Sequence, residues 1–190
     1  MDEIELLRGI LAGTGDVIEG VGDDQWQLGT PCPDYDVSAL VDHILGWARA
    51  FAAGANGEKF EGDPSAHHRG DDPAGEFRAT AARMVAGWEE HGFDRQVSMG
   101  GGESPAAMAF NMTVMEYLTH GWDLATATGQ PRPWSDEQAA EVLARAEKTL
   151  PAQYRGEGMP FGDIVTIPAT APVADRVAAF LGRTPPQSKR

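Results

Sequence analysis

The chain has 190 residues, of which 42% are hydrophobic and 23% charged, and its 15 basic and 29 acidic side chains give a formal net charge of −14. This length and composition are typical of one globular domain over residues 1–190, which is large enough to bury a hydrophobic core without the disulfides or structural metals that small domains need. The acidic balance argues against nucleic acid and an anionic membrane surface as partners, because both attract basic surfaces.

The single cysteine, Cys32, leaves no internal disulfide and fits a reducing compartment. Residues 1–5 contain neither the basic nor the apolar region of a signal peptide. No apolar run reaches the roughly 18 residues that a membrane span needs. We therefore expect a cytoplasmic protein that does not cross a membrane.

Helical patterns dominate the first part of the chain. Apolar side chains recur at helical spacing over residues 2–20, which predicts a first helix there. Residues 30–36 contain two prolines and predict a rigid loop, because proline cannot continue a helix. Asp36 or Ser38 can then cap a second helix over residues 37–55.

The middle of the chain begins with a long connection. Residues 54–72 are rich in Gly, Pro, Asp and His, which is typical of a loop. Asp72 as cap and Pro73 at the first helical position predict a third helix that ends near residue 91. A short extended stretch and turn follow over residues 93–102.

Ser104 and Pro105 repeat the cap-plus-proline pattern and predict a fourth helix over about residues 105–127, which Gly129 ends. A capping-box pattern over residues 135–138 opens a fifth helix that ends near residue 150.

Two small additions are expected at the C-terminal end. Residues 161–167 are interpreted as one short strand, and residues 173–181 as a short final helix. The expected fold class is therefore all-α. It consists of four long helices in a bundle, long connections and small C-terminal additions.

Glu116 and His120 lie four residues apart in the fourth expected helix, so both side chains project from one helix face. His43 lies between Leu40 and Trp47 on the apolar face of the second expected helix. Buried carboxylates and imidazoles are costly unless satisfied, and a divalent cation would satisfy all three. The spacing alone leaves open an exposed side-chain pair or a core contact without metal.

One carboxylate and two imidazoles form a ligand set that suits Zn, Ni, Fe or Mn better than Ca or Mg. Three protein ligands also leave coordination positions open, which is typical of catalytic rather than structural sites.

Two neighbours of these candidate ligands have alternative interpretations. Asp123 follows His120 by three residues and could accept the free ring N–H of a ligated imidazole. The alternative for Asp123 is a solvated carboxylate near the end of its helix. Trp47 lies one turn beyond His43 and either lines a cofactor-binding pocket or anchors the core.

For the other residues with reactive side chains, a structural or solvent-exposed role is favoured over a chemical one. Cys32 lies between two prolines, with no second cysteine and no clear base beside it, so burial as a small hydrophobe is favoured over a nucleophile. His67 and His68 are adjacent in a loop and do not share a helix face, so a solvated pair is favoured over a metal pair.

Several blocks of the sequence resemble a bacterial family. The segment TPCPDYDVSALVDH, residues 30–43, resembles the pattern TPCPxWxVxxLxxH, and EYLTHGWDLATATG, residues 116–129, resembles ExLxHGWDLAxATG. Residues 161–163 and 175–183 are similar to the tail of the same family. The chain thus resembles the actinobacterial metal-binding group related to the N-terminal domain of mycothiol-dependent maleylpyruvate isomerase, within the DinB-like (YfiT-like) superfamily.

The resemblance implies a DinB-like four-helix bundle and a divalent metal, usually zinc or nickel, held by His43, Glu116 and His120. It also implies that the metal activates a low-molecular-weight thiol, which is mycothiol in actinobacteria. The isomerase itself carries an additional C-terminal domain, and this chain is too short to contain all of it. Glu116 stands where plain DinB proteins have a third histidine, as in the isomerase branch.

The leading functional hypothesis is a metal-dependent transferase or isomerase that joins a small-molecule thiol to a small electrophile. A second hypothesis is a non-catalytic bundle that binds a metal or another ligand, and a third is a hydrogen-bonded core network without metal. A metal at the base of an open pocket would favour the first, and a closed shell of four protein ligands the second. Either a monomer or a homodimer is compatible with the sequence.

Overall fold

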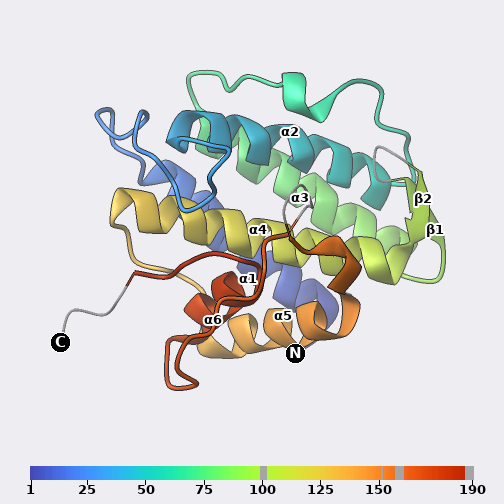
Figure 1. The fold of residues 1–190 in the computed structure, drawn as a ribbon. Coiled ribbons are helices and arrows are strands. Elements are labelled where there is room, and N and C mark those ends of the chain that lie inside the picture. Colours follow the sequence, from blue (N-terminus) through green and yellow to red (C-terminus); the bar gives the residue numbers. More distant parts are fainter. Residues whose placement is uncertain (99–101, 151, 157–160, 187–190) are drawn as a thin grey trace.

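The computed structural model describes residues 1–98, 102–150, 152–156 and 161–186. Within these ranges the chain forms helices almost throughout, with one two-stranded hairpin (Figure 1). The α-helices are α1 (Glu3–Glu19), α2 (Val37–Ala55), α3 (Pro73–His91), α4 (Ala106–Thr128), α5 (Asp136–Thr149) and α6 (Val173–Phe180).

The four longest helices form the expected bundle. Helix α1 packs on α3 and α4, and α2 packs on α3 and faces α4 (Figure 1). Helices α5 and α6 pack against each other and against α4, outside the bundle. The structure thus confirms the all-α prediction. The largest fully buried side chains come from all four bundle helices and include Leu6, Ile10, Leu40, Ile44, Phe77, Trp88, Phe110 and Trp122.

Local signals set most helix ends. The Asp36 carboxylate accepts the N–H of the third helical residue of α2, and Asp72 does the same for α3, so Asp36 rather than Ser38 is the cap. The capping box of α5 forms as predicted between Ser135 and Gln138. Gly129 ends α4 in the left-handed region, with φ of 72°.

The start of α4 differs from the prediction. Ser104 caps no helix; it lies in strand β2 (Glu103–Pro105), which pairs with β1 (Gln96–Ser98). Helix α4 begins at Ala106, whose N–H donates to the Arg95 carbonyl at 2.9 Å. The hairpin therefore replaces a side-chain cap. It confirms the expected extended stretch over 93–102, of which residues 99–101 lie outside the described ranges.

The strand predicted over residues 161–167 is wrong. Phe161 makes a single bridge to Arg155, and the Val165 N–H donates to the Ala179 carbonyl at 2.9 Å. No run of ladder hydrogen bonds forms along the segment. An extended stretch becomes a strand only when another strand edge satisfies its backbone, and α6 offers no such edge.

The long connection after α2 lies along that helix and contains a 3₁₀ turn, η1 (Pro64–Ala66) (Figure 1). Asp42 on α2 accepts the backbone N–H of Arg69 at 3.1 Å and its guanidinium at 2.9 Å. The His68 side chain is 84% exposed, as expected, but the expectation of a solvated pair is wrong for His67, which is only 13% exposed. His67 is partly buried, because its ring lies between Arg49 of α2 and Glu76 of α3.

Gly46 allows this connection to approach α2. A Cβ at residue 46 would overlap the carbonyl oxygen of Pro64. We expect Gly46→Ala to weaken the docking of the connection by about 1–3 kcal/mol, because backbone must move to accommodate the methyl group. Trypsin cleavage after Lys59 should then be at least about fivefold faster. Gly29→Ala, which meets nothing within 4 Å, is the control, and equal cleavage rates would contradict the prediction.

Among the described residues, no helix combines the length and the apolar character that a bilayer span needs.

Candidate metal centre

The three ligand candidates predicted from the sequence meet between α2 and α4, which run in opposite directions (Figure 1). The Glu116 Oε1 atom lies 3.0 Å from His43 Nε2 and 3.5 Å from His120 Nε2. One ligand atom from each residue lies within 4.8 Å of the others. His43 is 73 residues from Glu116 in sequence, so only the packing of the two helices brings the group together.

The outer nitrogen of each imidazole has a partner. His43 Nδ1 lies 3.1 Å from the Tyr35 hydroxyl, and His120 Nδ1 lies 3.1 Å from Asp123 Oδ2. Ligating histidines usually engage their second nitrogen in this way, which fixes the tautomer and the ring orientation. Both Nε2 atoms consequently face Glu116.

Asp123 is fully buried, so the solvated alternative does not describe it. Its carboxylate accepts from His120 and from the Arg183 guanidinium, whose Nη2 lies 3.0 Å from Oδ2. The Arg183 side chain is itself only 11% exposed. A chain of contacts therefore runs from the C-terminal segment through Asp123 to His120.

Electrostatics keep the Glu116 carboxyl ionised. Burial by itself would raise the pKa of Glu116, but the charge of His120, together with the hydrogen bond and charge of His43, outweighs burial and lowers that pKa. Burial would likewise lower the pKa of His120, but the neighbouring Glu116 and Asp123 raise it. The site therefore holds a negative charge and favours a positive one between the imidazoles.

The centre opens into a cavity of about 860 Å³. Trp47 and Phe51 line it from α2, and Met112 and Met115 line it from α4. These four side chains form the apolar end of the cavity, and the three ligand candidates form its polar end. The loop before α2 and the C-terminal segment complete the wall. Trp47 lies on the cavity, in agreement with one of its two sequence interpretations. The loop and C-terminal lining residues are Pro31, Cys32, Pro33, Asp34, Tyr35, Gly156, Phe161, Gly162, Gly182 and Arg183.

Cys32 also reaches this cavity, and it is 6% exposed. Together with His120 and Asp123 it forms a second group of close ligand atoms. The guanidinium of Arg183 already neutralises Asp123, which makes this group a poorer cation site. Burial raises the pKa of the Cys32 thiol, with Arg183 acting in the opposite direction. The burial of Cys32 agrees with its interpretation as a small hydrophobe.

Sequence reasoning missed Tyr35 and Arg183 as members of the site. Tyr35 lies eight residues before His43 in the proline-rich loop, and Arg183 follows the final helix by three residues. Both belong to segments that resemble the family, which is the only signal that could have drawn attention to them.

The donors fit a divalent transition metal. Two imidazole nitrogens and one carboxylate oxygen converge, and Tyr35 and Asp123 engage the nitrogens that face away. Zinc and nickel both accept this combination of nitrogen and oxygen ligands. His43, Glu116 and His120 are therefore the residues that could hold such an ion.

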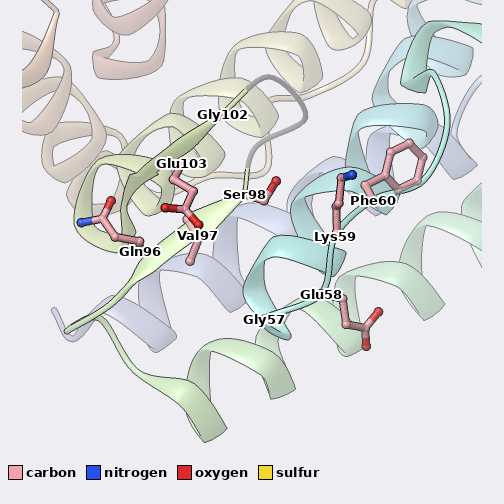
Figure 2. Close-up of a pocket in the computed structure, with 9 residues that line it drawn as sticks. All are labelled: Gly57, Glu58, Lys59, Phe60, Gln96, Val97, Ser98, Gly102 and Glu103. Carbon is pink, nitrogen blue, oxygen red and sulfur yellow. The ribbon is translucent and has the colours of Figure 1, made fainter.

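A second hollow, of about 510 Å³, lies between the end of α2 and the hairpin (Figure 2). Residues 57–60 and 96–98 line it, with Gly102 and Glu103 (Figure 2). Glu58 points away from the hairpin in Figure 2. Within the described part of the chain, no group of three close metal-ligating side chains lies at this hollow.

Comparison with known proteins agrees with the fold and the motifs. The family model described as the mycothiol maleylpyruvate isomerase N-terminal domain matches residues 7–125. Two uncharacterized proteins from two strains of Mycobacterium tuberculosis are each 33% identical over 168 residues, which cover 88% of this chain and 90% of the relative.

Two solved structures share the fold. They are the mycothiol-dependent maleylpyruvate isomerase and a mutant of it, with 18% and 19% sequence identity and a TM-score of 0.52 in both cases. The alignments cover 64% of this chain and 59% of the solved chains, so this chain matches less than two thirds of their length. Taken together, the family match and the mycobacterial relatives show that the chain belongs to the mycothiol maleylpyruvate isomerase N-terminal domain family.

Proposed function

We propose that the chain is a divalent-metal-dependent protein that brings a small thiol of the mycothiol type to a small electrophile, as a transferase or an isomerase. The observation that carries the proposal is the convergence of His43, Glu116 and His120 at the polar end of an open cavity. Open access is what a catalytic centre requires and a purely structural one lacks.

A divalent cation such as zinc or nickel, held by these three residues, would lower the pKa of a thiol and so make it nucleophilic at neutral pH. Tyr35 and Asp123 hold the two imidazoles in a ligating orientation. Arg183 donates to the buried Asp123 carboxylate, which also lies within hydrogen-bond distance of His120 Nδ1. Trp47 and Phe51 form an apolar side of the cavity.

In conjugation, the thiol sulfur would form a bond to carbon of an activated alkene, an epoxide or a halide, and the thiol proton would end on the product carbon or oxygen or leave with the halide. In isomerisation, the sulfur would add to the alkene, the former double bond would rotate, and elimination would break the carbon–sulfur bond and return the thiol with its proton. Support for mycothiol as the thiol comes from the names of the matching family and of the solved isomerases. Because the alignment covers only 59% of the solved chains, isomerisation and conjugation are both retained.

The hydrogen bond of 3.0 Å between His43 and Glu116 also fits the alternative of a core network without metal. That alternative gives no reason for three ligand-type side chains to line a cavity. A closed, non-catalytic metal bundle is likewise disfavoured, because a cavity of about 860 Å³ adjoins the three ligand candidates.

The test follows mycothiol consumption with a panel of an activated alkene, an epoxide and an aryl halide, and it also follows the mycothiol-dependent cis–trans isomerisation of the alkene, which returns the thiol. We expect thiol-dependent turnover that disappears on chelation and returns with zinc or nickel, because the thiolate forms only beside the cation. Reactions without protein and without thiol are the controls. Absence of thiol-dependent turnover across the whole panel, with metal content verified, would refute the transferase and isomerase readings together.

A further inference from the structure

A row of aromatic side chains leads away from the candidate metal centre along α2. His43, Trp47 and Phe51 are spaced by four residues and therefore share one helix face. The ring centroids of His43 and Trp47 are 6.2 Å apart, and those of Trp47 and Phe51 are 5.9 Å apart. The cavity thus changes from polar to aromatic within two helical turns.

The opposite wall continues the apolar end. Met112, one turn before Glu116 on α4, and Met115, the residue next to Glu116, line the same cavity. Phe161 lines it from the C-terminal segment. Phe51 is 7% exposed and Met115 is 2% exposed, so this end is shielded from solvent. Thioethers and aromatic rings together favour a flat, polarizable apolar group.

The described lining side chains of the cavity provide little positive charge for binding an anion. Arg183 is the only cationic lysine or arginine side chain among the described lining residues, and Asp34 and Glu116 add negative charge. The Arg183 guanidinium already donates to Asp123 from Nε and Nη2, and to the Leu181 carbonyl from Nη1. The sequence EGMP of residues 157–160 contains no lysine or arginine either.

We propose that the molecule bound at this apolar end is an uncharged, flat electrophile, whose apolar body lies against Trp47, Phe51 and Met112 and whose reactive atom faces Glu116. A carboxylate at this apolar end would lose its hydration without gaining an unpaired lysine or arginine among the described lining side chains. The proposal rests on the proposed function only in naming the bound molecule as the electrophile. Its test needs neither thiol nor turnover.

The test compares two unreactive probes that share a nitrophenyl ring, the uncharged 4-nitroanisole and the dianion 4-nitrophthalate. Each is titrated calorimetrically into the full chain, both zinc-loaded and after chelation. After chelation, when no metal ion can coordinate a carboxylate, we expect 4-nitroanisole to bind at least about tenfold more tightly than 4-nitrophthalate. The zinc-loaded form should also bind 4-nitroanisole. Trp47→Ala should weaken its binding at least about tenfold, because a large aromatic contact is lost.

Trp26→Ala is the matched control, because Trp26 is also half-buried but stacks under Arg69 outside the cavity. The Trp26→Ala variant should keep the wild-type Kd for 4-nitroanisole.

Met112→Arg adds a cation to the apolar wall and should reverse the preference in favour of 4-nitrophthalate. This variant tests the charge argument even if Trp47→Ala fails to fold. Tighter binding of 4-nitrophthalate to the chelated wild type would overturn the proposal. So would an unchanged Kd in folded Trp47→Ala. Retained 4-nitroanisole binding without thiol turnover would overturn only the proposed function.

Discussion

Replacing Glu116 with glutamine is expected to lower zinc affinity by about 100-fold or more. The substitution keeps the side-chain volume but removes the charge that lies 3.0 Å from His43 and 3.5 Å from His120. Changing groups that merely orient metal ligands costs about 10- to 100-fold in affinity, so losing a ligand itself should cost at least as much. Metal content after dialysis, followed by competition with a chromogenic chelator, measures the effect.

His43→Ala should change metal content in the same direction, because it removes the ligand contributed by α2. Glu89→Gln is a matched control, since Glu89 is a half-exposed carboxylate that pairs with Arg8 far from the cavity lining. Equal metal content in the wild type, Glu116→Gln and His43→Ala would show that these residues do not form the site. Circular dichroism confirms that each variant retains its helices.

Replacing Arg183 with methionine is expected to destabilise the fold by about 3–5 kcal/mol, because it leaves the fully buried Asp123 carboxylate without its counter-charge. For a chain of this size each kcal/mol corresponds to roughly 2–4 °C in Tm, which gives a fall of roughly 6–20 °C. Zinc affinity should also fall by about 10- to 100-fold, since Asp123 orients His120. Thermal unfolding of the metal-free protein and chelator competition measure the two effects separately.

The double variant Asp123→Asn with Arg183→Met should recover part of the lost stability, because no unpaired charge stays buried. Arg78→Met is the control: Arg78 pairs with Asp16 and Glu19 on the surface, where its loss should cost at most about 1 kcal/mol. If Arg183→Met and Arg78→Met melt at the same temperature, the buried pair does not stabilise the fold as argued.

The helices were predictable because their signals are local. Apolar spacing and caps such as Asp72 and Ser135 act within a few residues, and the observed helix ends agree closely with the expected ones. The errors arose where a distant partner decides. Ser104 pairs with Val97 instead of capping α4, and residues 161–167 have no strand edge to join.

Some residues of the candidate site were likewise predictable from local sequence, and others were not. Glu116 and His120 share a helix face by spacing alone, and His43 could be selected because it interrupts an apolar stripe of another helix. Periodicity could not select Tyr35 or Arg183, because Tyr35 contacts His43 from a loop and Arg183 reaches Asp123 from 60 residues away. Only the resemblance of their segments to the family could have drawn attention to them.

By itself, the sequence predicted the all-α class, most helix ends and three candidate metal ligands, since each depends on local spacing or side-chain chemistry. Only the tertiary structure decided that His43 contacts Glu116 and that the buried Asp123 pairs with Arg183. It also decided that a cavity with aromatic lining lies next to the three candidate ligands. Those features depend on how α2, α4 and the C-terminal segment pack. Packing is a property of the whole chain rather than of any one segment.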